Sequence, residues 1–340
     1  MTVQSNDAFA ARLLRWYDAH ARVLPWRIAP HSGHAPDPYR IWLAEVMLQQ
    51  TTVAAVAGYY ARFTARWPTV ADLAAADDAD VMAAWAGLGY YARARNLLAC
   101  ARSVTHAHGG LFPDSEAALR ALPGVGDYTA AAVAAIAFGR PAVVIDANIE
   151  RVMARHSAIA DPLPAAKRVI RAALAPLVPA DRPGDFAQAL MDLGSGICTV
   201  RRPQCAACPV AADCAARATG IAETLPVKAA RKAKPQRHGV AYWIERDGAL
   251  WLERRPDRGM LGGMLALPGD DWSAAAAPSP HALVVVRHSF THFDLHLALV
   301  RRTASVNRAD GQWWPLDALD AAGLPTLYRK AVDAMRKGQG

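Results

Sequence analysis

Four of the five cysteines in this 340-residue chain lie in one short segment, and this clustering constrains the fold more than any other feature. The spacing is Cys198-x6-Cys205-x2-Cys208-x5-Cys214, while Cys100 stands alone. In a reducing compartment such a cluster predicts a metal centre held by thiolates, not a disulfide framework. Four-cysteine zinc sites usually have two Cys-x-x-Cys pairs, whereas this segment has one. The spacing therefore favours a cubane iron–sulfur cluster, with zinc and free thiols as alternatives.

Residues 1–219 have the composition and the periodicity of a helical domain. Alanine is abundant, β-branched runs are short, and apolar residues recur at helical spacing over 41–63 and over 128–138. Turn signals rich in glycine and proline separate the helical segments. The cysteine cluster lies at the C-terminal end of this region, so the metal centre is expected there.

Residues 239–340 follow a period of two in place of the helical period. An Arg-Asp-Gly tripeptide between two apolar runs predicts a β-hairpin near the start of this region. Residues 283–302 alternate apolar and polar side chains, which predicts a strand with one buried face. Residues 327–337 are expected to form a closing helix. The pattern indicates a second domain of the α+β class.

Residues 220–238 join the two regions and carry half of the formal net charge of +8. Their prolines and cations predict a solvated linker, either a plain tether or a segment that lies along a nucleic-acid backbone. The overall basic excess permits a nucleic-acid partner without requiring one. No apolar run reaches the roughly 20 residues of a membrane span, and the N-terminus has no signal-peptide core. We therefore expect a soluble protein of the cytoplasm.

Two acidic residues stand in unusual surroundings. Glu45 is the lone charge in an apolar helical stretch, and Asp146 ends an apolar run just before the next helical segment. Each has an ordinary explanation, since Glu45 could be a surface residue and Asp146 a helix N-cap. Each could also be catalytic, because apolar surroundings raise the pKa of a carboxyl group.

Residues 122–126, Leu-Pro-Gly-Val-Gly, separate two helical segments. A glycine turn leaves backbone N–H groups free at the start of the second helix, where they suit a phosphate. Taken alone, this motif is a weak signal, and an ordinary helix–helix turn is the better explanation of the same residues.

Together these motifs closely resemble the MutY-type adenine DNA glycosylases of the endonuclease III superfamily, over essentially the whole chain. The matching segments are Pro25-Trp26-Arg27, Trp42–Thr51, Gly87–Leu97, Leu122–Gly126 with Tyr128, Asp146 with Asn148, and Met191–Gly194 before Cys198. The resemblance implies a multidomain chain with an all-α helix-hairpin-helix DNA glycosylase domain over 1–219. The hairpin lies within 115–138, and the loop over 198–214 holds a [4Fe–4S] cluster. A linker over 220–238 leads to an α+β Nudix-like lesion-recognition domain over 239–340, which lacks the Nudix hydrolase box.

The resemblance implies an enzyme that flips adenine out of duplex DNA where it is mispaired with 8-oxoguanine or guanine, and hydrolyses its glycosidic bond. Glu45 would be the general acid and Asp146 the carboxylate that stabilises the sugar cation, with Asn148 beside it. Tyr128 stands where strand-nicking members have a lysine that forms a Schiff base. Since a phenol cannot form an imine, an efficient lyase step is not expected. The enzyme is expected to be a monomer in the bacterial cytoplasm.

DNA contacts are also implied. Gln50 and Tyr90 would fill or wedge the duplex, Gln188 would read the adenine edge, and the tripeptide from Phe290 to His292 would read the opposing lesion. Thr replaces the family's Ser at position 291 of that tripeptide. Ordinary alternatives are core packing for Tyr90, a solvated helix face for Gln188, and an exposed strand histidine for His292. The complete set of implied contacts is Arg27, Gln49, Gln50, Leu88, Tyr90, Leu122, Gly124, Val125, Gly126, Gln188, Phe290, Thr291 and His292.

Two other functions compete with this interpretation. One is an endonuclease III-like glycosylase with lyase activity on oxidised pyrimidines, against which Tyr128 and the second domain argue. The other is an iron–sulfur protein that only binds DNA, against which the pair of Glu45 and Asp146 argues.

Overall fold

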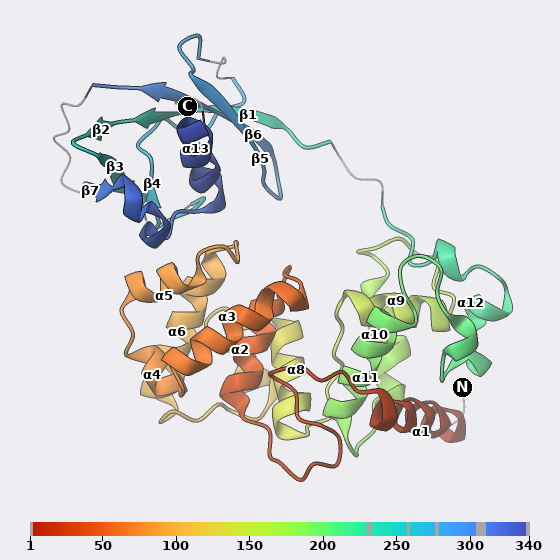
Figure 1. Ribbon diagram of the computed structural model, residues 1–340. Helices are drawn as coiled ribbons and strands as arrows, with labels where there is room; N and C mark the ends of the chain where they lie inside the picture. The colour runs from red at the N-terminus through yellow and green to blue at the C-terminus, as the bar shows by residue number, and fades with distance from the viewer. Residues whose placement is uncertain (1–2, 230–232, 257–258, 276–278, 304–310, 338–340) are drawn as a thin grey trace. The chain divides into compact units, whose positions relative to one another are not determined.

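The computed structural model describes residues 3–229, 233–256, 259–275, 279–303 and 311–337. It divides into two compact units, one of Met1–Ala75 with Ala99–Ala230 and the other of Ala76–Leu98 with Arg231–Gly340. The first unit is helical and the second contains all the described strands (Figure 1). No described helix is long and apolar enough to cross a membrane.

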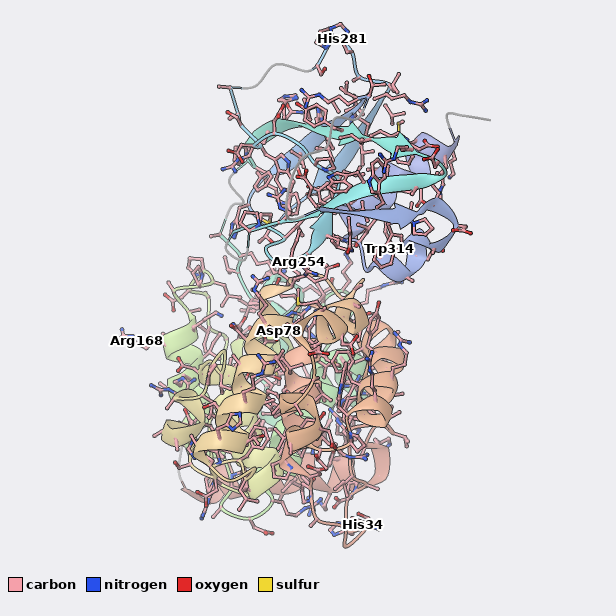
Figure 2. All side chains as sticks on the ribbon, turned by 90° about the vertical axis from the view of Figure 1, so that its left-hand side faces the viewer. His34, Asp78, Arg168, Arg254, His281 and Trp314 are labelled. Atoms are coloured by element: carbon pink, nitrogen blue, oxygen red, sulfur yellow. The ribbon has the colours of Figure 1, made fainter. Side chains whose placement is uncertain are left out.

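The first unit is built from helices that pack around α8 and α11. Its α-helices are α1 Val3–His20, α2 Pro38–Leu48, α3 Val53–Arg66, α4 Val70–Ala74, the C-terminal part of α6 Ala92–Ala107, α7 Glu116–Arg120, α8 Asp127–Phe138, α9 Ala147–His156, α10 Lys167–Leu174, α11 Pro183–Gly196 and α12 Ala215–Ala218. Helix α8 packs against α2, α7 and α11, and α11 packs against α9 and α1. His34 lies near the tip of the long α1–α2 connection and points away from the helices (Figure 2).

Local signals explain where α2 and α3 begin and end. The Asp37 carboxylate caps α2 by accepting the N–H of Tyr39 at 2.9 Å. The apolar stretch over 41–63, which the sequence predicts to be helical, is interrupted by a turn in which Gln50 has a φ of +57°. The Thr52 side chain then caps α3. The turn places Gln49 and Gln50 between α2 and α3.

The second unit contains helix α5, the start of α6, seven strands and a C-terminal helix. Their bounds are α5 Asp78–Trp85, β1 Gln236–Trp243, β2 Glu245–Arg246, β3 Ala249–Arg254, β4 Leu265–Ala266, β5 Val284–Ser289, β6 Asp294–Arg301, β7 Gly311–Pro315 and α13 Thr326–Lys337. One sheet has the order β1-β6-β5, with β1 and β6 parallel and β5 antiparallel to β6. In the other sheet, β3 pairs antiparallel with β2, β4 and β7.

The predicted hairpin near the start of this region is confirmed, whereas the single strand predicted over 283–302 is divided by a turn into β5 and β6, and the predicted alternation holds within β6. Leu295, Leu297 and Leu299 on β6 are fully buried, as their alternation predicts. The β2–β3 hairpin turns at Asp247 and Gly248, both with positive φ, which is the type I′ geometry that suits an Asp-Gly pair. His281 projects from the turn that precedes β5 (Figure 2).

The described part of the stretch over 220–238 differs from the solvated linker that the sequence predicts, while residues 230–232 of that stretch lie outside the described residues. Leu225 is only 3% exposed, and the Val227 carbonyl accepts the N–H of Leu163 at 2.9 Å. Strand β1 already begins at Gln236. The physical reason is that the apolar side chains in this stretch are buried against the helical unit. The free energy gained by this burial outweighs the tendency of the neighbouring cations to keep the segment in solvent.

Candidate active site

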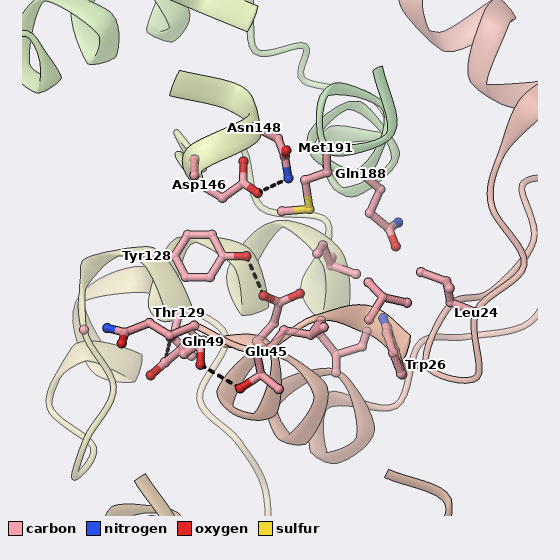
Figure 3. A pocket seen from close by; sticks show the side chains of 18 of the residues that line it. Leu24, Trp26, Glu45, Gln49, Tyr128, Thr129, Asp146, Asn148, Gln188 and Met191 are labelled. Carbon is pink, nitrogen blue, oxygen red and sulfur yellow. Dashed lines mark hydrogen bonds between the residues drawn. The ribbon is translucent and has the colours of Figure 1, made fainter. Parts of the chain in front are cut away.

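A cavity of about 730 Å³ lies in the helical unit, lined by α2, the α2–α3 turn, and the starts of α8 and α9 together with α11. Figure 3 shows Glu45 on α2, Tyr128 at the start of α8, and Asp146 with Asn148 at the start of α9 around one space. The two acidic residues that stand out in the sequence therefore face the same cavity.

Glu45 is buried, at 6% exposed, because the rest of α2 packs into the core. Its Oε2 accepts a hydrogen bond of 2.6 Å from the Tyr128 hydroxyl. Burial raises the pKa of Glu45 to about 6, the Tyr128 hydrogen bond holds it down, and the nearby Asp146 carboxylate raises it. The interpretation of Glu45 as a surface residue is wrong, and its carboxyl group can carry a proton near neutral pH.

Asp146 caps helix α9 and also lines the cavity. Its Oδ1 accepts the N–H of Ile149 at 2.7 Å, and its Oδ2 accepts from Asn148 Nδ2 at 2.9 Å. Burial raises the pKa of Asp146, while these two hydrogen bonds lower it. The cap and the catalytic interpretation are compatible, because the side chain can do both at this position.

Arg151 connects Asn148 to the segment that precedes the cysteine loop. Its Nη2 donates to Asn148 Oδ1 at 2.9 Å and to the Gly194 carbonyl at 2.6 Å, and its Nε donates to the Cys198 carbonyl at 2.7 Å. A methyl group on Gly194 would lie 2.6 Å from Asn148 Cβ, so the glycine allows α11 to approach α9. The position of Asn148 is thus fixed from several sides.

The four clustered cysteines line one small cavity of about 30 Å³. Arg155 is almost fully buried and donates to Cys198 Sγ at 3.3 Å and to the carbonyl of Thr199 at 2.7 Å. A cysteine sulfur that accepts an N–H and faces an apolar space is typical of iron–sulfur sites. Among the described residues, no three His, Cys, Asp or Glu side chains form a group suited to a single metal ion. The four cysteines that line the cavity are Cys198, Cys205, Cys208 and Cys214.

The predicted turn lies directly before α8. Leu122 and Val125 are buried, and Gly124 has a φ of +71°. Gly126 is the N-cap of α8 and supplies no side-chain hydrogen bond. The buried pair anchors the turn, so any contact these two residues make to a ligand would use their backbone.

The remaining predicted contacts in the helical unit have different surroundings. Gln188 is buried, at 7% exposed, and lines the cavity, so the solvated-face alternative is wrong. Gln49 donates to Thr129 Oγ1 at 3.0 Å, while Gln50 is exposed beside the cavity. Arg27 also lines the cavity.

Arg27 is held by an acidic partner on α11. Its Nη1 donates to Asp192 Oδ2 at 2.6 Å, and Arg22 Nε donates to the other oxygen at 2.5 Å. The side chains of Arg27 and Asp192 are 7% and 2% exposed. Arg27 therefore acts first as part of a buried ion pair, and its charge lowers the pKa of Glu45 only as a minor effect.

The predicted contacts of the second unit fall into buried and exposed groups. Leu88 is buried, which supports core packing, while Tyr90 is 48% exposed with a φ of +49°. The Tyr90 hydroxyl lies 3.1 Å from Thr291 Oγ1. Thr291 and His292 are exposed, whereas the Phe290 ring packs against neighbouring aromatic rings. The Phe290 ring is therefore held by its aromatic neighbours, while the two residues that follow it are open to solvent.

Comparison with known proteins identifies the family. Residues 43–179 match the HhH-GPD superfamily of base excision DNA repair proteins, and residues 239–334 match the NUDIX domain. The adenine DNA glycosylase of Homo sapiens is 34% identical over 403 residues, which cover 96% of this chain and 74% of the relative. The chain belongs to the adenine DNA glycosylase family. The adenine DNA glycosylase of Mus musculus is 37% identical over 401 residues, covering 96% of this chain and 78% of the relative.

A solved structure agrees with this assignment. The structure of a thermostable thymine-DNA glycosylase is 30% identical, with a TM-score of 0.56, and the alignment covers 64% of this chain and 98% of that one. The predicted fold class, a helix-hairpin-helix glycosylase domain followed by a Nudix-like domain, is confirmed. The chain is a DNA glycosylase, which removes the alternative of a protein that only binds DNA.

Several residues that shape this glycosylase site escape sequence reasoning. Arg151 and Arg155 follow Asn148 at helical spacings of three and seven, so their shared face on α9 could have been noticed. Asp192 gives no such signal, because the arginines that it binds lie some 165 to 170 residues away in the sequence.

Proposed function

We propose that this glycosylase removes adenine opposite 8-oxoguanine or guanine in duplex DNA and leaves an abasic site. The observation that carries the proposal is the pairing of a buried, protonatable Glu45 with a hydrogen-bonded Asp146 at one cavity of about 730 Å³. A cavity of this size is typical of small-ligand sites and has room for one base flipped out of the stack.

Glu45 is the proposed general acid. Because its pKa is raised to about 6, about one tenth of the molecules carry the proton at pH 7. Tyr128 occupies Oε2, which leaves Oε1 to hold the proton and donate it to N7 of adenine. Protonation makes adenine a neutral leaving group, so the electron pair of the C1′–N9 bond departs with the base.

Asp146 is the proposed electrostatic partner of the sugar. Loss of the base leaves positive charge on C1′ and the ring oxygen, and a carboxylate held in place by Ile149 and Asn148 stabilises that charge. Water then adds its hydroxyl to C1′, and its proton returns to Glu45. The balance is one water consumed, one adenine released and one abasic sugar formed.

Tyr128 supports a reaction without an efficient lyase step. The tyrosine hydroxyl is already committed to Glu45, and burial raises the pKa of Tyr128 well above its usual value. A neutral phenol in this position offers no amine for a Schiff base, so strand cleavage would need added alkali.

The other cavity and surface residues support DNA binding. The buried amide of Gln188 can both donate to and accept from the adenine edge. Gln50 and Tyr90, both exposed and both with positive φ, suit insertion into the duplex. The free N–H groups that follow Gly126 suit a DNA phosphate.

We propose that the four clustered cysteines hold a [4Fe–4S] cluster. The small apolar cavity that they line and the N–H of Arg155 directed at Cys198 Sγ support this assignment. The cluster, when bound, would supply four iron–thiolate bonds that cross-link the loop. Arg151 and Arg155 would hold that loop against α9 through the backbone carbonyl of Cys198.

The domain roles follow from this assignment. Residues 1–219 would form the catalytic domain, residues 220–238 the connection, and residues 239–340 the reader of the opposing lesion through Thr291 and His292. A monomer suffices for this chemistry, since all proposed catalytic residues come from one helical unit. An enzyme that acts on chromosomal DNA must be in the same compartment as the chromosome, which in a bacterium is the cytoplasm.

A single-turnover assay on duplexes with adenine opposite 8-oxoguanine tests the proposal. We expect adenine release and an abasic product that breaks only after alkali. Absence of adenine release would refute the proposed substrate, and strand breaks without alkali would favour the lyase alternative.

Two variants test the role of Glu45. Glu45→Gln keeps the shape but removes the proton donor, so base release should fall about a hundredfold or more while duplex binding persists. Glu223→Gln, at an exposed position outside the cavity, should leave the rate unchanged. Normal base release by Glu45→Gln would exclude Glu45 as the acid.

A further inference from the structure

The hairpin between β5 and β6 ends in a tight turn. The N–H of Phe290 donates to the Phe293 carbonyl at 2.9 Å, which closes the turn. Thr291 and His292 are its two central residues, and both are exposed. These are the two side chains of the hairpin tip that are available to a ligand.

A lysine just before β1 binds the side of this turn. Lys234 Nζ donates to the Phe290 carbonyl at 2.7 Å and to Ser289 Oγ at 3.1 Å. The next residue, Pro235, accepts the N–H of Asp294 at 3.0 Å through its carbonyl. The two residues that enter β1 therefore hold both strands of the hairpin where the turn begins.

Aromatic packing fixes the base of the turn from the other side. The Phe290 ring stacks on Trp272, with centroids 5.4 Å apart, and packs against Phe293 at 4.9 Å. The Arg237 guanidinium lies 4.4 Å from the centroid of the Phe293 ring. A side chain at Gly239 would come within 2.4 Å of Trp272, so the glycine makes room for this stack. The turn is thus held by packing at its base and by Lys234 at its backbone.

The carbonyl that Lys234 binds belongs to the peptide plane that also carries the N–H of Thr291. Because the peptide is planar, holding the Phe290 oxygen also fixes the direction of that N–H. Guanine and 8-oxoguanine differ at N7, which accepts a hydrogen bond in the first and donates one in the second, and at the added oxygen on C8. A reader that separates the two bases must hold its donors and acceptors within hydrogen-bond tolerance.

We propose that Lys234 is a positioning residue for lesion recognition, which fixes the Thr291–His292 turn and thereby sets the preference for 8-oxoguanine over guanine opposite adenine. This inference rests on the proposed reading role of the turn. The hydrogen bonds of Lys234 run to Ser289 and Phe290, and neither of these residues lines the cavity of Glu45. Its loss should change recognition of the opposing base and leave base excision itself intact.

The test uses the full-length enzyme and duplexes with adenine opposite 8-oxoguanine or guanine. Lys234→Met removes both hydrogen bonds but keeps much of the stem, and Lys234→Arg retains a donor that can reach the same carbonyl. Lys337→Met, at an exposed position on α13, is the charge-matched control. Dissociation constants are measured for both duplexes at several salt concentrations, together with the single-turnover rate at saturating enzyme and the midpoint of urea unfolding.

We expect Lys234→Met to reduce the affinity ratio between the two duplexes by about three- to tenfold, the effect of losing hydrogen bonds from a partly solvated ammonium group. The saturated rate on the 8-oxoguanine duplex should stay unchanged, Lys234→Arg should restore most of the ratio, and Lys337→Met should match the parent. An unchanged ratio in Lys234→Met overturns the proposal. So does an equal loss of affinity for both duplexes with a shallower salt dependence, which identifies Lys234 as a phosphate contact.

Alanine substitutions of Thr291 and His292 separate this inference from the function on which it rests. If they leave the ratio unchanged, the turn is not the reader and both proposals fail. If they reduce the ratio while Lys234→Met does not, the turn reads the lesion and only the positioning role of Lys234 fails.

Discussion

Replacing Tyr128 by phenylalanine should shift the pH dependence of base excision upward. The Tyr128 hydroxyl donates to Glu45 Oε2 at 2.6 Å and stabilises the ionised carboxylate. Burial raises the pKa of Glu45 to about 6 against the effect of this hydrogen bond. Phenylalanine keeps the ring and removes only the donor, so the pKa of Glu45 must rise further.

The size of the shift follows from the value of one hydrogen bond to a charged group. Such a bond is worth about 1.5–3 kcal/mol, and about 1.4 kcal/mol corresponds to one pKa unit. The protonated carboxyl also loses a partner, so we take the difference as about one unit, which moves the pKa of Glu45 from about 6 to about 7. At pH 8 the protonated fraction then rises from about 1% to about 10%.

The assay is the single-turnover rate of adenine release at saturating enzyme from pH 5 to pH 9. The rate of the parent should fall tenfold per pH unit above about pH 6, and Tyr128→Phe should begin this fall about one unit later. Tyr39→Phe, which removes another buried hydroxyl from α2 but lies outside the cavity, should leave the profile in place. A rate that rises with pH through 6 would refute the acid role of Glu45, and an unmoved alkaline limb would refute the coupling to Tyr128.

Three further substitutions test the surroundings of the site. Gly194→Ala should lower the free energy of unfolding by about 1–3 kcal/mol and reduce the rate, because its methyl group would clash with the first turn of α9. Gly196→Ala is the control on the same helix. It has open space and should leave both urea unfolding and activity unchanged. Asp192→Asn should cost about 3–5 kcal/mol, measured by urea unfolding, since it leaves the buried Arg27 without its anion. The freed charge should also lower the pKa of Glu45 and move the alkaline limb of the pH profile downward, the opposite of Tyr128→Phe. Arg155→Lys should release iron faster to a chelator, followed by visible absorbance, because lysine cannot replace a guanidinium that binds several carbonyls at once.

Local elements of the fold could be predicted wherever the signal lies within one turn or one strand. The Asp247–Gly248 hairpin turn, the alternation on β6 and the helix after Gly126 all follow from neighbouring residues. The break between α2 and α3 could not be predicted from periodicity, since the apolar pattern continues through it. The turn depends on the positive φ of Gln50 and on the Thr52 cap. A glutamine and a threonine are only weak sequence signals for the end of one helix and the start of the next.

The sequence indicates which residues belong to the candidate site, but it does not indicate which of them contact one another. Glu45 and Asp146 stand out as charges among apolar residues, but they lie about 100 residues apart and nothing local brings them to one cavity. The hydrogen bond from Tyr128 to Glu45 requires α2 and α8 to pack, which is a property of the tertiary structure. Phe290 shows the same limit, because its packing against Trp272 depends on a residue from a separate connection.

The different roles proposed for the two carboxyl groups follow from how many donors each one accepts. Both are buried, so desolvation raises both pKa values. Asp146 accepts from Ile149 and from Asn148, and these hydrogen bonds act against that rise and favour its ionised form. Glu45 accepts from Tyr128, and the Arg27 charge that lowers its pKa is paired with Asp192. Burial is therefore the largest influence on both pKa values, and the cap of α9 works against it at Asp146, which favours an acid at Glu45 and a stabilising anion at Asp146.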